Sequence, residues 1–65
     1  MKNRIKDLRE LNGLTQQQLA DLVEVSRQTI ISLEGGRYNP SIFLAHKLAQ
    51  VFHKSIEEVF IFEEN

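Results

Sequence analysis

Over most of this 65-residue chain, apolar residues recur at the three- and four-residue spacing of amphipathic helices, with short polar connections between the runs. The pattern predicts five helices, over residues 3–12, 16–23, 27–35, 42–52 and 56–60. The fold class is therefore all-α, and we expect residues 1–65 to form a single domain. Residues 60–62 are strand-forming types. The sequence leaves open whether they form a short terminal antiparallel β-pair with residues 1–3.

Residues that can cap helix ends support these boundaries. Four helices follow a serine or threonine whose side chain can accept a hydrogen bond from a free amide of the first turn: Thr15, Ser26, Ser41 and Ser55. Gln18 and Glu58 follow Thr15 and Ser55 at the spacing of a capping box. Gly13 stands where a left-handed residue can end the first helix.

The same spacing predicts which side chains face inward. The predicted core residues are Ile5, Leu8 and Leu11 in the first helix, Leu19, Ala20, Leu22 and Val23 in the second, Ile30 and Leu33 in the third, and Leu44, Ala45, Leu48, Val51 and Phe52 in the fourth. A chain of this length buries only about 60% of its unfolded surface, so we expect modest stability.

The second and third helices are joined by only three residues, Glu24-Val25-Ser26, and the third has two different faces. Its apolar face is anchored by Ile30 and Leu33. Its other face presents Arg27, Gln28, Ile31 and Ser32. A helix held on one side, with hydrogen-bonding groups on the other, can enter the major groove of DNA. The pair therefore predicts a helix-turn-helix.

Most of the chain resembles the phage-repressor and Cro family of helix-turn-helix regulators, also called the XRE family. The match runs from Arg4 to Phe52 and on into the tail. It rests on four motifs in register: LxxxGLTQxxLA, VSRQTI, LExGRYNPS and SIEEVF. The tail SIEEVFIFEEN is similar to that of the short dimeric members. The resemblance implies a five-helix lambda-repressor-like domain that binds double-stranded DNA as a homodimer.

Arg27 and Gln28 are candidate base readers, because arginine can grip guanine O6 and N7, and glutamine adenine N6 and N7, with two bonds each. Ser32 lies one turn further along, where it either reaches a base or stays on a solvated face. Ile31 either touches a thymine methyl group or packs at the rim of the helix, and the sequence favours neither.

The resemblance also implies phosphate contacts on both sides of the groove. Gln16, in the first turn of its helix, corresponds to the family's phosphate clamp, where free backbone amides favour an anion. The second set consists of Thr29, Gly36, Arg37, Tyr38 and Asn39. Tyr38 could equally pack on the domain.

Arg9 and Glu34 occupy the positions of an inward-facing ion pair that, in the family, ties the first helix to the end of the third. The chain departs from the family in two places. Glu24 stands where relatives usually have a glycine with positive φ, a conformation that costs a non-glycine residue about 1 kcal/mol. Gly35-Gly36 stands where relatives commonly have Asn-Gly, and we expect it to let the backbone approach a phosphate.

Residues 55–65 are rich in apolar side chains for the end of so small a domain. These side chains are Ile56, Val59, Phe60, Ile61 and Phe62. Because an exposed apolar patch usually marks an interface, we expect this segment to hold a homodimer together. The alternative is that some of these side chains close the domain's own core.

Charge and composition narrow the functional classes. The net charge is −1, but residues 26–54 hold four basic residues against Glu34 alone, whereas the last eleven hold four glutamates and no base. We therefore expect local attraction of phosphate and weak affinity for random DNA. The absence of cysteine excludes disulfides and thiol chemistry. His46 and His53 have no partner at metal-ligand spacing. With no apolar run of about 18 residues and no signal peptide, the composition fits a cytoplasmic protein.

Together these features predict a sequence-specific transcriptional regulator, most simply a repressor, that binds a near-palindromic operator without metal or cofactor. Two alternatives come from other classes. The first is an antitoxin or protein-interaction module whose acidic C-terminus holds an unidentified protein partner. The second is an enzyme, which the lack of a nucleophile–base pair, a metal set or a phosphate loop argues against.

Overall fold

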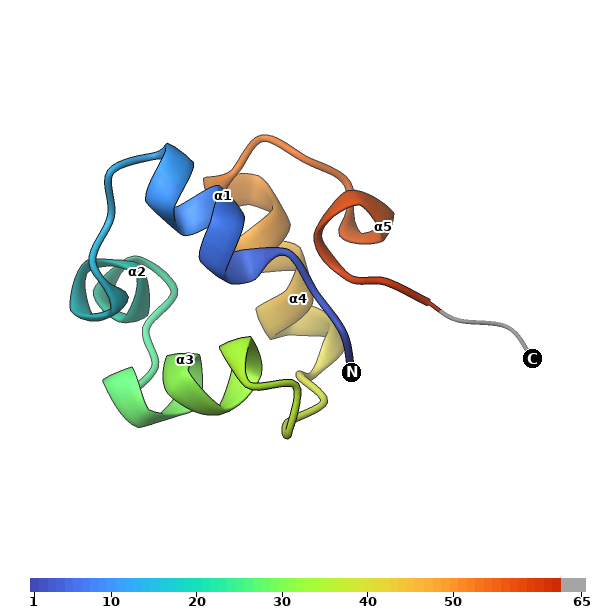
Figure 1. Cartoon of the computed structure of the whole chain (residues 1–65), viewed down its shortest axis with the longest axis horizontal. Helices are drawn as coiled ribbons and strands as arrows, with labels where there is room; N and C mark the ends of the chain where they lie inside the picture. The colour runs from blue at the N-terminus through green and yellow to red at the C-terminus, as the bar shows by residue number, and fades with distance from the viewer. Residues whose placement is uncertain (63–65) are drawn as a thin grey trace.

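The structure, a computed structural model, describes residues 1–62. Its five helices are α1 (Ile5–Leu11), α2 (Gln16–Leu22), α3 (Arg27–Glu34), α4 (Ile42–Val51) and α5 (Ile56–Val59). Figure 1 shows α1 to α4 around a common centre, with α5 and residues 60–62 on the side away from α2. The all-α, five-helix prediction is confirmed, and every boundary lies within two residues of the expected one.

The predicted caps form. The side chains of Thr15, Ser26, Ser41 and Ser55 each accept a hydrogen bond from the backbone amide three residues later. Both capping boxes close, because Gln18 and Glu58 accept from the amides of Thr15 and Ser55, each at 2.9 Å. The caps explain why such short helices begin at these residues.

The four longer helices end in the same way, each with a residue of positive φ: Gly13 (68°), Glu24 (60°), Gly36 (75°) and His53 (55°). At the end of α2, the amide of Val25 donates to the Ala20 carbonyl at 3.0 Å and that of Glu24 to the Asp21 carbonyl at 3.3 Å. This is the Schellman pattern. The left-handed conformation expected at Glu24 is confirmed, and His53 shares it.

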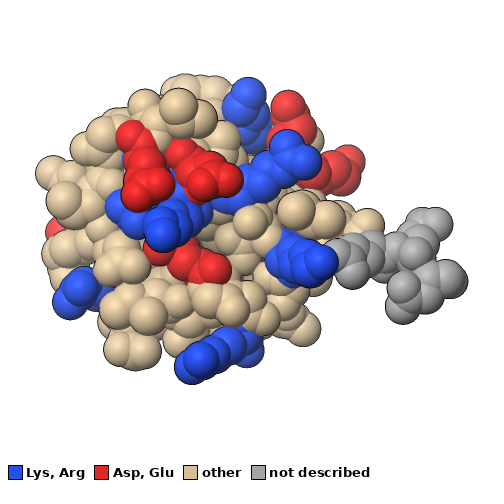
Figure 2. Space-filling view, in the orientation of Figure 1, with Lys and Arg blue, Asp and Glu red and all other residues tan. Residues whose placement is uncertain are grey.

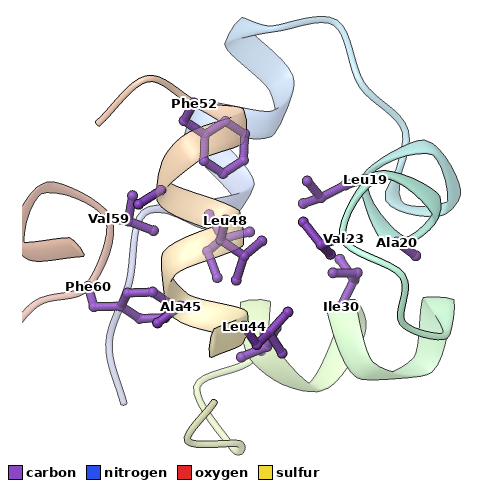
Figure 3. Close-up of a cluster of buried hydrophobic side chains, with 13 residues drawn as sticks. Leu19, Ala20, Val23, Ile30, Leu44, Ala45, Leu48, Phe52, Val59 and Phe60 are labelled. Atoms are coloured by element: carbon purple, nitrogen blue, oxygen red, sulfur yellow. The ribbon is translucent and has the colours of Figure 1, made fainter. Parts of the chain in front are cut away.

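A single apolar cluster fills the centre of the molecule. It comprises Ile5, Leu19, Ala20, Val23, Ile30, Leu33, Leu44, Ala45, Leu48, Ala49, Phe52, Val59 and Phe60. Figure 3 shows Leu19, Ile30 and Leu48 pointing into the space between α2, α3 and α4. Leu8 and Val51 are partly buried against this cluster.

Two residues assigned to the core are exposed instead: Leu11 by 82% and Leu22 by 57%. Each follows a buried residue by two positions, Arg9 and Ala20 respectively. Because a helix turns about 100° per residue, a side chain two positions on points to nearly the opposite side. The core prediction for these two leucines was therefore wrong.

The two ends of the described chain meet in one antiparallel bridge, between Asn3 and Phe60. Two backbone bonds flank it, from the Arg4 amide to the Val59 carbonyl (2.8 Å) and from the Ile61 amide to the Lys2 carbonyl (2.9 Å). The pairing that the sequence left open is therefore a single bridge, and residues 1–62 contain no β-strand.

No helix within residues 1–62 is long and apolar enough to cross a membrane. The same residues bring no three histidine or acidic side chains together in an arrangement that could hold a metal ion. His46 and His53 are exposed. Glu63 and Glu64, two of the four glutamates of the acidic C-terminus, lie outside the described residues.

Candidate nucleic-acid interface

Helix α3 has one buried face and one solvent-facing face, as its sequence predicts. Ile30 and Leu33 are fully buried, whereas Arg27, Gln28 and Ile31 are exposed. Ser32 and Thr29 are half-buried, and the Thr29 hydroxyl lies 3.0 Å from that of Ser26. Because α2 packs against the inner side of α3, the outer face is presented by a rigid pair of helices.

Figure 1 places α3 along one edge of the molecule, where no other helix covers it. In the same orientation, Figure 2 shows acidic and basic groups side by side over the region of α1, whereas the edge formed by α3 and the loop after it carries separate basic groups. Arg27 and Arg37, at the start of α3 and in the loop after it, are both exposed, so this edge can attract phosphate locally.

The loop after α3 exposes Arg37, Tyr38 and Asn39, with 43% of Tyr38 accessible. The amides of Gly36 and Arg37 are used to end the helix, since they donate to the carbonyls of Leu33 and Ser32. Within residues 1–62, the amides of Tyr38 and Asn39 have no protein acceptor. These two amides, the Arg37 guanidinium, the Tyr38 hydroxyl and the Asn39 side-chain amide are therefore the donors that the loop can offer an anion.

Gly36 faces the N-terminal segment and not open solvent. A Cβ at this position would lie 3.5 Å from the Met1 carbonyl oxygen, and the Met1 amino group donates to the Gly36 carbonyl at 2.8 Å. The expectation that this glycine lets a phosphate approach the backbone does not match this geometry. A glycine is favoured here because the residue that ends α3 has a positive φ, of 75°, which glycine adopts without steric cost.

Asn3 connects three parts of the structure. Its side-chain nitrogen donates to the Leu33 carbonyl, near the end of α3, at 2.7 Å. Its side-chain oxygen accepts from the Ile5 amide, at the start of α1, at 3.1 Å. Its backbone forms the bridge to Phe60. Sequence reasoning missed this role, because no local pattern links an asparagine at the start of the chain to a helix thirty residues away.

The ion pair between α1 and α3 is present. Arg9 Nε lies 2.6 Å from Glu34 Oε2, and the two side chains are only 11% and 8% exposed. Arg9 also donates to the Leu14 carbonyl at 2.9 Å. The hydrogen bond to Glu34 raises the pKa of Arg9 above its ordinary value. The pair therefore fixes the C-terminal end of α3 against α1.

Gln16, expected to clamp a phosphate, contacts protein atoms at both polar ends. Its side-chain nitrogen donates to Glu34 Oε1 at 3.1 Å, and its side-chain oxygen accepts from Arg27 Nη2 at 3.4 Å. The residue that begins α2 thus links the buried ion pair to the residue that begins α3.

Comparison with known proteins identifies this arrangement. Residues 5–59 match the model of the helix-turn-helix family. The chain belongs to that family. Over 98% of its length it is 52% identical to an uncharacterized helix-turn-helix-type transcriptional regulator of Archaeoglobus fulgidus, 90% of which is covered. It is 38% identical over 94% of its length to a competence pilus inhibition repressor of Acinetobacter baylyi, 56% of which is covered.

A solved structure agrees. The restriction-modification controller protein C.AhdI of Aeromonas hydrophila superposes with a TM-score of 0.77 over 85% of this chain and 83% of its own, at 33% identity. The resemblance to the XRE type is thereby confirmed. This helix-turn-helix protein is a transcriptional regulator that binds DNA, and the family to which it belongs consists of regulators and not of enzymes.

Of the C-terminal apolar residues of this helix-turn-helix protein, some lie in the core and others at the surface. Val59 and Phe60 are 0% and 1% exposed, so these two members of the expected dimer interface close the domain's own core. Ile56 and Ile61 are half-buried, and Phe62 is 58% exposed. The side chains that a partner could reach are therefore these last three.

Sequence reasoning missed two further exposed apolar residues. Ile42 and Phe43, in the first turn of α4, are 68% and 79% exposed. Ile42 lines a shallow cleft with Ile56 and Phe62. The signal was available, because four consecutive apolar residues from Ile42 to Ala45 cannot all face the same side of a helix. We call Ile42, Ile56, Ile61 and Phe62 the C-terminal apolar surface; Phe43 is exposed next to Ile42 in the sequence but lines neither of the clefts that join these residues.

Proposed function

We propose that this regulator is a homodimeric repressor that reads a near-palindromic operator with α3. One observation carries the proposal: Ile30 and Leu33 hold α3 by a fully buried face, while the opposite face leaves Arg27 and Gln28 in solvent. Side chains that protrude from a rigidly held helix can reach base edges in the major groove without reorganising the domain.

In this proposal Arg27 bonds a guanine and Gln28 an adenine, each through two hydrogen bonds. Ser32, half-buried one turn later, has room for one contact at the edge of the site. Ile31 is 36% exposed beside them and offers a methyl-sized surface to a thymine. Three or four readers in each subunit give a short half-site, so selectivity requires two half-sites.

Phosphate contacts follow from which donors are free. Arg37, Tyr38 and Asn39 are exposed at the end of α3, and they flank one strand when α3 enters the groove. Other candidates already form hydrogen bonds within the protein, through the Thr29 hydroxyl, the Gly36 carbonyl and the Gln16 side-chain amide. We therefore place these three residues behind the direct contacts, where their hydrogen bonds support the ends of α2 and α3.

The C-terminal apolar surface supports the dimer. Ile42 and Phe62 are each more than half exposed and line one cleft with Ile56, and exposed apolar residues that lie together usually mark an interface. Two copies related by a twofold axis through this surface would present two α3 helices to successive major grooves, about 34 Å apart.

A repressing effect is the simplest outcome of such binding, because a protein bound across a promoter blocks it. The relationship to the Acinetobacter baylyi protein, which is named as a repressor, supports this direction. Selection of bound sequences from a random DNA pool tests the proposal. We expect two inverted half-sites about 10 base pairs apart from centre to centre. Enrichment of a single half-site, or of no sequence, would contradict it.

A further inference from the structure

The side chain of Asn3 caps two helices at once. Its oxygen accepts from the Ile5 amide, in the first turn of α1, at 3.1 Å, and its nitrogen donates to the Leu33 carbonyl, near the end of α3, at 2.7 Å. The start of a helix exposes donors and its end exposes acceptors, so only a side chain that carries both kinds of group can serve both ends. One amide therefore ties the end of α3 to the start of α1.

The Leu33 carbonyl belongs to the turn that leads from α3 into the DNA-facing loop. Its oxygen also accepts from the Gly36 amide at 3.0 Å, and the Ser32 carbonyl accepts from the Arg37 amide at 3.1 Å. These two backbone bonds set the direction in which Arg37 leaves the helix. A carbonyl oxygen has two lone pairs, so Leu33 can accept from Asn3 and still close the turn. The side chain of Asn3 therefore reinforces the turn from outside the helix.

The turn needs such support because it contains two glycines in succession. Gly35 and Gly36 have no side chain with which to pack on the domain, and glycine loses more backbone freedom on ordering than any other residue. The three residues that follow, Arg37, Tyr38 and Asn39, are all exposed. Their placement relative to α3 therefore depends on the hydrogen bonds that hold this turn.

Asn3 is itself held by the core of the domain. Its backbone forms the antiparallel bridge to Phe60, which is only 1% exposed. Two backbone hydrogen bonds flank this bridge, at 2.8 and 2.9 Å. Because the backbone of Asn3 is fixed in this way, its side chain is a firm anchor for the turn after α3.

We propose that Asn3 is a positioning residue for DNA binding, which holds the turn after α3 so that Arg37, Tyr38 and Asn39 meet the phosphate backbone in an arrangement already formed in the free protein. A loop ordered in advance loses less conformational entropy on binding, so the affinity rises without a further contact. The inference rests on the proposed function, in which this loop binds phosphate. Because phosphate contacts carry no sequence information, Asn3 should act on all DNA alike.

The test measures affinity for two short duplexes of equal length, one with a single half-site and one of random sequence. One half-site engages one subunit, so weakened dimerisation cannot explain a loss. Asn3→Ser keeps an oxygen that can accept from the Ile5 amide, but its side chain is too short to reach Leu33. It should lower both affinities by the same factor, about twofold to tenfold, the range for one net hydrogen bond. The salt slope should stay unchanged, because no phosphate contact is removed.

Asn12→Ser is the matched control. The Asn12 side chain donates to the Leu8 carbonyl, also at 2.7 Å, near the end of α1. The substitution removes the same kind of bond from a helix that does not lead into the loop, so both affinities should remain those of the wild type. Denaturation of both variants checks that each is fully folded under the binding conditions, so that a loss of stability alone cannot lower the affinity.

Gly35→Ala tests whether the loss passes through the turn. Gly35 has a helical backbone with φ of −76°, and a Cβ there would lie 3.4 Å from the Ile31 carbonyl oxygen, an ordinary van der Waals distance. Alanine therefore fits, and it stiffens the turn because it has less backbone freedom than glycine. Added to Asn3→Ser, it should restore part of the affinity for both duplexes.

The outcomes separate this inference from the proposed function. Unchanged affinities for Asn3→Ser, a loss confined to the half-site duplex, or a loss that Gly35→Ala does not reduce would overturn the positioning role. A salt slope lower by about one unit would also overturn it, since Asn3 would then contact a phosphate itself. If Arg37→Ala leaves the salt slope unchanged, the loop does not bind phosphate, and that part of the proposed function fails together with the positioning role.

Discussion

The α2–α3 region and the C-terminal apolar surface put opposite kinds of side chain in contact with solvent. Along α3 the apolar residues Ile30 and Leu33 are fully buried and the exposed side chains are mostly polar. Across the start of α4 and the tail, Ile42 and Phe62 remain exposed although Val59 and Phe60 fill the core. One region is therefore suited to a charged ligand and the other to an apolar one.

The two regions should also differ in how their binding depends on salt. Contacts with phosphate release counterions, so the affinity of α3 and its loop for DNA should fall steeply with salt. Burial of apolar surface has no such dependence and should be slightly strengthened by excluded salts. Two functions in a chain of 65 residues can thus respond independently to solution conditions.

The largest expected effect comes from removing one partner of the buried ion pair, which anchors α3. Arg9→Ala or Glu34→Ala should lower the free energy of unfolding by about 3 kcal/mol or more, because the remaining charge is left buried. The double variant Arg9→Met with Glu34→Leu should recover much of this loss, since no charge stays unpaired. Chemical denaturation compares the three variants, and single variants within about 0.5 kcal/mol of the wild type would show that the pair contributes little.

The next effect concerns the apolar surface. Ile42→Lys or Phe62→Lys should give monomers that bind the operator about 100-fold more weakly, because linked half-sites lose their effective concentration. The added charge is positive, so repulsion from phosphate cannot explain the loss. Leu22→Lys is the control, as Leu22 is 57% exposed but lies on α2, and it should stay dimeric. Sedimentation and operator binding give both readouts. A dimeric Ile42→Lys protein with full affinity would place the interface elsewhere.

Within the DNA-facing region, base readers and phosphate contacts should respond differently. Arg27→Ala or Gln28→Ala should cost about 1–3 kcal/mol at the preferred operator and relax specificity at one base position. Arg37→Ala should weaken binding to all sequences alike and reduce the salt slope by about one unit. Titrations of operator and random DNA in a salt series distinguish them. Equal losses on both DNAs for Arg27→Ala would remove its assigned role.

A smaller effect is expected at the turn between α2 and α3. Glu24→Gly should stabilise the fold by up to about 1 kcal/mol, because glycine adopts positive φ without steric cost. Gly13→Ala tests the same physics in reverse: its Cβ would meet nothing within 4 Å, so any loss comes from backbone conformation alone. Thermal unfolding should show a higher melting temperature for Glu24→Gly and a lower one for Gly13→Ala than for the wild type. Shifts of the same sign would show that these helix ends are not equivalent.

The smallest effect is a pH dependence at the start of α5. Hydrogen bonds from Ser55 lower the pKa of Glu58 in the folded protein. Its stabilising contribution is therefore complete above the ordinary glutamate pKa of about 4.3 and is lost as pH falls through the lower folded value. Glu58→Gln should flatten the acid limb of the stability–pH profile, whereas Glu57→Gln, which forms no cap, should leave it unchanged. Identical acid limbs for the wild type and Glu58→Gln would contradict this.

Local signals in the sequence were enough for the helices and the helix-turn-helix. Capping residues such as Thr15 and Ser26 act on amides three residues away, and Ile30 and Leu33 lie on one helical face by spacing alone. The ion pair of Arg9 and Glu34 followed from the family resemblance. These features depend on neighbours along the chain or on a pattern shared by the whole family.

Features set by distant contacts could not be found in this way. Leu11 points outward because Arg9, two residues earlier, turns inward to meet Glu34. The contact of Asn3 with Leu33, and the division of the tail between core and surface, depend on how segments far apart in sequence come together. The contact between Gln16 and Arg27 likewise spans two helices.

The central claim is that α3 binds DNA through charge and hydrogen bonds while a separate apolar surface joins two subunits. Sedimentation velocity of the protein with operator DNA, across a series of rising salt concentrations, tests both parts in one experiment. We expect the protein–DNA complex to disappear with a steep dependence on salt and the released protein to sediment as a dimer at every concentration used. Release of the protein as monomers, or a complex that persists unchanged at high salt, would contradict the account.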